Sequence, residues 1–207
     1  MSHALGVNRL ATGKRYDTAA EQALVEQCRR QDFEAFGRIV DAYQSRVFGF
    51  VKRMLPSDEE AMDVTQEVFI KAYQAVSRFD GRSSLRTWLF KIAYNLCVDR
   101  ARRADRGLQT VSFEPTQIGD EMFDVADRTW NPEDVVLNHE FMEIVERAIR
   151  SMSEKLRIVL LLHDKEDMGY EEIAKTVDVP VGTVKSRLFL ARAHVQQYVS
   201  QYMKEGA

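Results

Sequence analysis

The 207-residue sequence contains few of the features that mark secreted, membrane-spanning or metal-binding proteins. Its two cysteines, Cys28 and Cys97, lie far apart without a CxxC pair, and its four histidines are not at metal-ligand spacing with them. We therefore expect free thiols in a reducing cytoplasm, no metal site and no other cofactor. No apolar run approaches the roughly 20 residues that span a bilayer. The polar, basic stretch 1–16 lacks the apolar core of a secretory signal, so we expect a flexible tail there.

Other absences narrow the class of protein further. The chain has only four prolines and no low-complexity tract, which argues against wholesale disorder. It has no glycine-rich phosphate loop and no pattern of a nucleophile with its base, so nothing supports an enzyme. Alternating strand patterns of useful length are also missing. The expectation that remains is an all-α protein that is not an enzyme.

The net charge of −3 conceals two blocks of opposite sign. Residues 83–106 carry six cations against two acids, whereas residues 107–134 carry seven acids against one cation. The distribution of charge says more about nucleic-acid binding than the net charge does, and clustered cations favour it. The acidic block contains glycine and proline and has no sustained periodicity, which is typical of a linker.

Helical periodicity runs along both sides of the acidic block. Apolar residues three or four apart predict a helix that Asp32 caps and Pro56 ends. Ser57 has capping-box spacing to Glu60, and a further helix is expected after Ser84. The predicted order is a tail 1–17, a helical domain 18–106, an acidic linker 107–131 and a second helical domain 132–207 that begins at Asn131-Pro132.

The last two predicted helices, 170–177 and 181 to about 202, are separated by three residues that include Pro180. A short helix, a tight break and a longer helix fit a helix-turn-helix. On the longer helix we expect Val181, Val184, Leu188, Ala191 and Val195 to face inward. Polar, basic and apolar side chains on the other sides could meet phosphates, base edges and thymine methyl groups in a major groove. These are Thr183, Lys185, Ser186, Arg187, Phe189 and Leu190.

An ordinary helical hairpin with a solvated charged face is the alternative for this segment. Exposed Phe189 and Leu190 weaken it, because a merely solvated face has no use for them.

The helix predicted over 57–79 has one apolar face for the core and an opposite face of mixed chemistry. Ile70 sits in the middle of that second face. It is either a lone exposed apolar residue, which is common, or the centre of a docking surface with a polar rim. Periodicity favours neither reading. The mixed face gathers Asp63, Gln66, Glu67, Ile70 and Gln74.

The helix after Ser84 carries another outward stripe, which mixes cations, an aromatic ring and an amide. This composition suits unpaired DNA, because cations bind phosphates, aromatic faces stack on bases and polar groups meet base edges. A solvated basic face is the alternative. The stripe consists of Thr87, Lys91, Tyr94, Asn95, Val98 and Arg102.

Four segments carry a resemblance to a known family. Residues 63–69, Asp-Val-Thr-Gln-Glu-Val-Phe, and residues 78–95, which begin Arg-Phe-Asp-Gly-Arg-Ser-Ser, resemble region 2 of the extracytoplasmic-function (ECF) sigma factors of the sigma-70 family. Residues 170–174, Tyr-Glu-Glu-Ile-Ala, and residues 180–188, Pro-Val-Gly-Thr-Val-Lys-Ser-Arg-Leu, resemble their region 4. The resemblance covers roughly residues 18 to 203.

The resemblance implies a non-enzymatic factor that binds core RNA polymerase and directs promoter-specific transcription initiation, and that an anti-sigma factor holds inactive. The mixed face from Asp63 to Gln74 would dock on the clamp helices of the polymerase largest subunit. Recognition and melting of the −10 element would fall to Phe79, Arg82, Ser83, Ser84, Arg86, Trp88, Lys91, Asn95 and Arg102. The −35 element would be read by Thr183, Lys185, Ser186, Arg187 and Phe189.

Two departures and two rival functions accompany the resemblance. Gly169 stands where the family usually has a Ser or Thr cap, and Leu190 where a polar or basic residue is common. One rival is a single-component helix-turn-helix regulator, which would bind duplex DNA without polymerase. The other is a sigma-like decoy that titrates an anti-sigma protein; it would carry a receiver domain, for which this chain has no room, and need not keep DNA-contacting cations.

Overall fold

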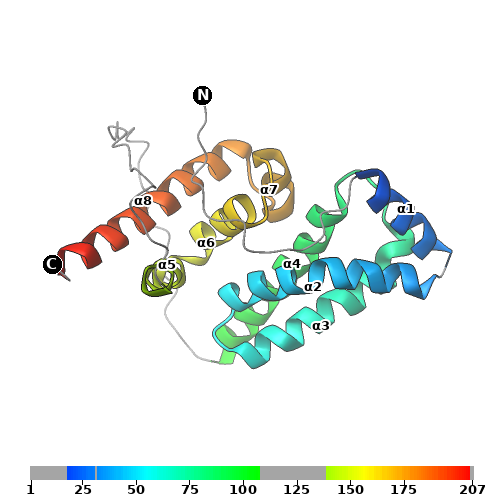
Figure 1. The fold of residues 1–207 in the computed structure, drawn as a ribbon, viewed down its shortest axis with the longest axis horizontal. Coiled ribbons are helices and arrows are strands. Elements are labelled where there is room, and N and C mark those ends of the chain that lie inside the picture. The colour runs from blue at the N-terminus through cyan, green and yellow to red at the C-terminus, as the bar shows by residue number, and fades with distance from the viewer. Residues whose placement is uncertain (1–17, 31, 108–138, 206–207) are drawn as a thin grey trace.

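A computed structural model describes residues 18–30, 32–107 and 139–205 of the chain (Figure 1). Within these ranges every regular element is a helix and no strand occurs, so the expected all-α class is confirmed. The predicted tail 1–17, nearly all of the predicted linker and the helix start at Asn131-Pro132 lie outside the described residues. None of the helices in the described ranges is long and apolar enough to cross a membrane.

The N-terminal half consists of α1 to α4, coloured blue to green in Figure 1. Oδ1 of Asp32 accepts the backbone N–H groups of Glu34 and Ala35 at 3.0 and 3.1 Å, which caps α2. Oγ of Ser57 accepts the N–H of Glu60 at 3.1 Å and caps α3, so both predicted caps are confirmed. The bounds are α1 Thr18–Arg29, α2 Phe33–Met54, α3 Asp58–Ala75 and α4 Leu85–Gly107.

The helix expected over 57–79 is shorter than the sequence predicts. Its α-helical part, α3, ends at Ala75, and a 3-10 turn follows over Val76–Arg78. A 3-10 turn has three residues per turn, so it brings Val76 and Phe79 to the same side. Both side chains are buried, at 2% and 8% exposure. The tighter turn therefore places Phe79 in the core, and the chain leaves the core there as a loop.

Helices α2, α3 and α4 share the apolar core of this half. Val47 and Val51 of α2 and Val68 of α3 are fully buried. The rings of Phe50 and Phe90 meet edge to face with their centroids 5.4 Å apart, which ties α2 to α4. Burial of one such side chain stabilises a fold by about 1.5–3 kcal/mol, so these helices form a firm support for the surfaces they carry.

The C-terminal half ends in the predicted helix-turn-helix, formed by α7 and α8. Asp178 in the break adopts a left-handed conformation, with φ 55° and ψ 55°. Of the five residues expected to face inward, Val184, Leu188 and Ala191 are buried, and the two outer ones are half-buried. The bounds are α5 His139–Ser151, α6 Glu154–Leu160, a π-helical turn Leu161–Lys165, α7 Tyr170–Val177 and α8 Val181–Glu205.

The two halves pack against each other. Helix α4 lies alongside α7, and α2 also touches α6 (Figure 1). The surfaces predicted to bind DNA therefore come from two bodies that are in contact with one another in this structure.

Candidate nucleic-acid interface

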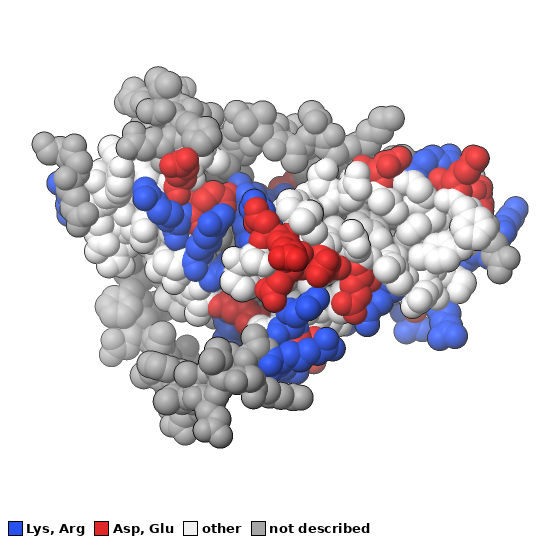
Figure 2. All heavy atoms as spheres, turned by 90° about the horizontal axis from the view of Figure 1, so that it is seen from below, with Lys and Arg blue, Asp and Glu red and all other residues white. Residues whose placement is uncertain are grey.

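The outward face of α3 carries the residues expected to dock a partner. Asp63, Gln66 and Gln74 are exposed, and Glu67 has 41% of its side chain exposed. Ile70 is 56% exposed although it is apolar. Figure 2 views the molecule from below, the side on which α3 lies in Figure 1, and acidic side chains form a band across it. The outward face of α3 thus combines an exposed apolar residue, Ile70, with acidic and amide side chains.

Three apolar residues that the sequence reading missed extend this face. Met62 and Tyr73, on the same side of α3 as Ile70, are 52% and 39% exposed. Phe33, at the start of α2, is 70% exposed, and its ring stacks on Tyr73 with the centroids 5.7 Å apart. Helical spacing from Ile70 could have indicated Met62 and Tyr73. Phe33 belongs to another helix, and no local pattern relates it to them.

The loop before α4 is held in a defined shape from several sides. Gly81 has a φ of +74°, which side chains other than glycine rarely adopt. Asp80 accepts the backbone N–H of Arg82 at 3.1 Å and pairs with its guanidinium at 2.9 Å. The Arg82 side chain is nevertheless 89% exposed. The ring of Phe79 packs on half-buried Trp88, with the centroids 5.0 Å apart, so Phe79 supports the loop from beneath.

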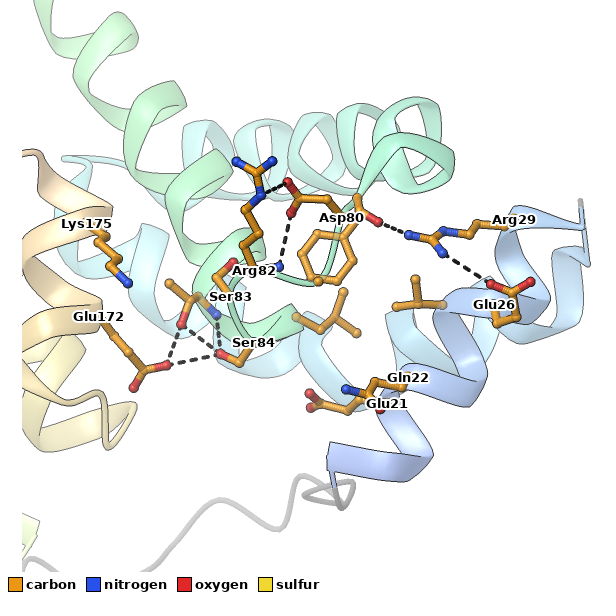
Figure 3. Close-up of a pocket in the computed structure, with 15 residues that line it drawn as sticks. Glu21, Gln22, Glu26, Arg29, Asp80, Arg82, Ser83, Ser84, Glu172 and Lys175 are labelled. Atoms are coloured by element: carbon orange, nitrogen blue, oxygen red, sulfur yellow. Dashed lines mark hydrogen bonds and ion pairs between the residues drawn. The ribbon is translucent and has the colours of Figure 1, made fainter.

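A cavity of about 720 Å³ opens beside this loop (Figure 3). Residues of the loop form one wall, including half-buried Ser83 and Ser84. Helix α1 forms a second wall, where Arg29 donates to the backbone oxygen of Phe79. Glu172 and Lys175 of α7 close a third side. The cavity therefore belongs partly to each half of the chain.

The basic stripe on α4 is exposed at three of its six predicted positions. Lys91, Asn95 and Arg102 lie on its solvent side. Tyr94 and Val98 of the same stripe are half-buried, and burial raises the pKa of the Tyr94 phenol. Cationic and polar groups are thus presented along one face of the helix.

Thr87 is an exception, and its predicted exposure is wrong. Its side chain is only 3% exposed, because α7 covers this turn of α4. The Thr87 hydroxyl donates to Oε1 of Glu172 at 2.7 Å, and Ser84 lies 3.2 Å from the same oxygen. Arg86 pairs with Oε2 of Glu172 at 3.2 Å. Periodicity within α4 could not indicate this contact, because the covering residue lies 85 positions away.

The Glu172 carboxylate is the centre of this polar cluster. It also accepts the N–H of Gly169 at 3.0 Å, which is the glutamate half of a capping box at the start of α7; Gly169 has no side chain to supply the other half. Burial alone would raise the pKa of Glu172. The hydrogen bonds from Thr87 and Gly169 and the charge of Arg86 outweigh burial and lower that pKa. Glu172 is therefore a stably charged acceptor at neutral pH.

The outward face of α8 presents a varied set of side chains. Lys185 and Ser186 are exposed, and Phe189 is 51% exposed. Thr183 and Arg187 are half-buried. The Ser186 hydroxyl donates to backbone oxygens of the preceding turn at 3.0 and 3.2 Å. The exposed phenyl ring has no role in the core, which favours a partner surface.

No group of three or more His, Cys, Asp or Glu residues in the described ranges is arranged to hold a metal ion.

Comparisons with known proteins bear on both halves of the chain. The family model described as sigma-70 region 2 matches residues 39–107, and that for sigma-70 region 4 matches residues 142–195. The ECF RNA polymerase sigma-E factor of Escherichia coli K12 is 36% identical over 189 residues, which cover 89% of this chain and 96% of that protein. The chain belongs to the ECF sigma factors. The RNA polymerase sigma-H factor of Pseudomonas aeruginosa is likewise 36% identical over 189 residues.

As an ECF sigma factor, the protein is a transcription initiation factor that works with core RNA polymerase at promoters, and it is not an enzyme. Because region 2 matches as well as region 4, a single-component helix-turn-helix regulator is not supported. The sigma factor's fold resembles that of CnrH in its complex with the cytosolic domain of CnrY, with a TM-score of 0.63 and 22% identity over 88% of this chain and 98% of that one. It also resembles RpoE of Bartonella quintana in complex with the anti-sigma factor NepR, with a TM-score of 0.60 and 22% identity over 80% and 96%.

Proposed function

We propose that the three exposed faces divide the work of promoter-specific initiation among them. The face of α3 docks on core RNA polymerase. The loop before α4 and the basic stripe of α4 bind and melt the −10 element. The outward face of α8 reads the −35 element. The corresponding domains are region 2 over 18–106, an acidic linker over 107–131 and region 4 over 132–207, preceded by a tail 1–17.

The exposed apolar patch formed by Phe33, Met62, Ile70 and Tyr73 supports the docking role most directly. Four large apolar side chains exposed on one surface favour a partner-binding site, because contact of apolar surface with water is unfavourable. The acids on the same face, Asp63 and Glu67, favour a partner with basic or polar groups at its rim. Asp63, Gln66, Glu67 and Gln74 supply the polar contacts of this surface.

For the −10 element, we assign phosphate contacts to Arg82, Arg86, Lys91 and Arg102, and contacts with bases to Asn95 and the loop serines, Ser83 and Ser84. Phe79 and Trp88 shape the loop from the core side, and direct contact of Phe79 with a base would require its ring to leave the core. For the −35 element, Lys185 and Arg187 suit phosphate or guanine, while Thr183, Ser186 and Phe189 suit base edges and thymine methyl groups.

We also propose that an anti-sigma factor regulates this protein and that it acts in the cytoplasm. The support is the kinship with ECF sigma factors, together with a fold like those of CnrH and RpoE in their complexes. Co-purification of the native chain followed by mass spectrometry tests both partners. Core polymerase subunits and one small protein are expected, and a preparation with neither contradicts the proposal.

The assigned division of labour is tested by transcription with purified core polymerase. Core polymerase alone should initiate without promoter preference. Addition of the chain should give transcripts from promoters with two separated conserved elements. Absence of any preference with the chain present contradicts the proposed function.

A further inference from the structure

Helix α1 is anchored beside the loop before α4. It packs on α2 and on the 3-10 turn that follows α3. Leu24, Val25 and Cys28 of α1 are buried, so one side of this helix belongs to the core. The Tyr43 hydroxyl of α2 donates to a carboxylate oxygen of Glu21 on α1. Packing and hydrogen bonding together hold the backbone of α1 in place, so side chains at its end project from a firm support.

Arg29, the last residue of α1, connects this helix to the loop before α4 (Figure 3). Its Nη2 donates to the backbone oxygen of Phe79, and its Nη1 donates to Oε2 of Glu26 at 3.2 Å. A guanidinium group is planar and rigid, so contacts on both terminal nitrogens fix its position and direction. Phe79 lies 50 positions further along the chain, so Arg29 joins two segments that are distant in sequence.

The backbone oxygen that Arg29 holds lies where the loop leaves the core. The ring of Phe79 packs on Trp88, and the N–H of Phe79 donates to the oxygen of Val76 at 3.1 Å. The carbonyl group of Phe79 belongs to the peptide group that links it to Asp80. A peptide group is planar, so a hydrogen bond to this oxygen orients the whole group. Arg29 therefore sets the direction in which Asp80 follows the core.

The direction of Asp80 is passed on to residues that the proposed function assigns to the −10 element. Oδ1 of Asp80 accepts the N–H of Arg82 at 3.1 Å, a turn in which a short acidic side chain binds the backbone two residues on. Gly81, between the two, has a φ of +74°. The positions of Arg82 and Ser83 therefore depend on how the chain leaves Phe79.

We propose that Arg29 is a positioning residue for −10 recognition, which sets the shape of the loop before α4 and does not itself contact DNA. The proposal rests on the −10 assignment made above. Two donors of Arg29 are engaged within the protein, and Glu26 offsets its charge. The alternative is a direct contact with a DNA phosphate. Loss of a phosphate contact weakens all promoters alike and lowers the salt dependence, whereas a misplaced loop changes which −10 bases are preferred.

The test uses core polymerase with the full chain and a promoter library randomised at the −10 element. Sequencing of the transcribed promoters gives the preference at each −10 position. Gel-shift titrations at several salt concentrations give the salt dependence of promoter binding. Arg29→Gln removes both the charge and the paired donors. Arg29→Lys keeps the charge but replaces the rigid fork with a point charge on a flexible stem.

Two further variants serve as controls. Arg30→Gln removes the same charge from the neighbouring residue, whose side chain is 77% exposed and pairs with the other oxygen of Glu26 at 3.6 Å. Asn95→Ala tests the −10 assignment separately, because it removes an assigned base contact on α4 and leaves Arg29 in place. Circular dichroism of all four variants shows whether the helices remain intact.

We expect both Arg29 variants to relax the −10 preference, with the ratio between favoured and disfavoured bases falling by about tenfold, as after loss of one base contact. The salt dependence should stay as in the wild type, and Arg30→Gln should match the wild type in both measurements.

An unchanged −10 preference in Arg29→Gln overturns the proposal, and so does a uniform loss with reduced salt dependence, which indicates a phosphate contact. Wild-type behaviour of Arg29→Lys in both measurements also overturns it, because charge alone would then suffice. If Asn95→Ala changes the −10 preference and the Arg29 variants do not, the −10 assignment stands and only the role of Arg29 is refuted. If none of these variants changes it, the −10 assignment fails as well.

Discussion

Two side-chain nitrogens of Arg46 converge on one carboxylate oxygen of Glu166, at 2.9 and 2.5 Å, across 120 positions of sequence. Burial raises the pKa of Glu166, and the neighbouring guanidinium offsets part of that rise. Loss of one member of a buried ion pair costs about 3–5 kcal/mol when the other stays buried. In a chain of two halves, separation exposes that partner to water and limits the loss. Loss of Arg46 should therefore weaken the contact between the halves more than it destabilises either half.

The pH dependence of stability should carry the signature of Glu172. Its pKa is lower in the folded protein than the ordinary value of about 4.3. The stabilisation from the charged form is therefore complete above that ordinary value and is lost as the pH falls through the lowered pKa. Urea denaturation of the wild type and of Glu172→Gln should give free energies of unfolding that differ at neutral pH and converge as the pH falls below the lowered pKa of Glu172.

Glu171→Gln is the control for that comparison, because the same charge is removed from the same turn of α7. Its difference from the wild type in the free energy of unfolding should be smaller, because Glu171 is exposed and makes none of the contacts of Glu172 with α4. Glu166 acts in the opposite direction. Because its pKa is raised in the folded protein, its contribution to the free energy of unfolding declines as the pH rises through that raised value. A Glu172→Gln difference that stays constant from acid to neutral pH contradicts the assigned hydrogen bonds.

Leu188→Ala should destabilise region 4 itself. Leu188 is 2% exposed and packs between α8 and the rest of that half, so truncation leaves a cavity. We expect a loss of about 2–5 kcal/mol in the free energy of unfolding. Leu190→Ala, on the exposed side of the same helix at 38% exposure, is the matched control and should cost far less. Equal losses of stability from the two variants would contradict the inward orientation of Leu188 and the outward orientation of Leu190.

Ile70→Asp should weaken binding to core polymerase and leave helicity unchanged. Ile70 is 56% exposed in the free protein, so the new charge meets water there and faces burial only on docking. Burial of a polar or charged group without a partner costs at least about 1–3 kcal/mol. A pull-down titration with core polymerase measures the loss. Gln196 is exposed on α8, so Gln196→Asp introduces the same charge at a distant surface position. This control should bind core polymerase nearly as the wild type does.

Tyr73→Ala and Phe33→Ala probe the extension of the same patch. Their rings stack on each other at the surface, so each substitution removes apolar area from the proposed docking face. We expect both variants to bind polymerase more weakly and to keep a normal circular dichroism spectrum. Normal affinity in these two and in Ile70→Asp would exclude this face as the docking site.

Promoter opening should depend on Asn95 and Lys91. Both side chains are exposed on α4, on the stripe assigned to the unpaired strand. Asn95→Ala and Lys91→Ala should therefore reduce opening more than they reduce initial promoter binding. Permanganate reactivity of promoter thymines, measured beside a gel-shift assay, separates the two steps. Normal opening on a fully duplex promoter would leave the stripe as a solvated basic face.

The sequence predicts the individual helices well, because caps and periodicity are local signals. Asp32 and Ser57 cap the helices they were expected to cap, and α7 has the expected bounds. The sequence predicts the end of α3 too late. Val76 and Phe79 share one face in a 3-10 turn and nearly so in an α-helix, so periodicity does not distinguish the two structures.

Contacts between the halves could not be predicted, because they join residues that no local pattern relates. Thr87 belongs by spacing to the outward stripe of α4, yet α7 covers it. Glu172 has the position of a capping residue for α7, and nothing in its neighbourhood indicates a second role at the start of α4. The same holds for Phe33, which meets Tyr73 only through the packing of α2 on α3.

The most direct test of the account is a transcription assay with core polymerase over a promoter library randomised at the −35 element. Ser186 and Phe189 carry no charge, so they cannot act as simple phosphate clamps, and both are exposed on α8. Ser186→Ala and Phe189→Ala should each cost about 1–3 kcal/mol at particular −35 positions and relax the preference there. Lys185→Ala should lower transcription from all promoters more evenly and reduce the salt dependence. If the Ser186 and Phe189 variants keep the wild-type preference at every position, α8 does not read the −35 element through this face.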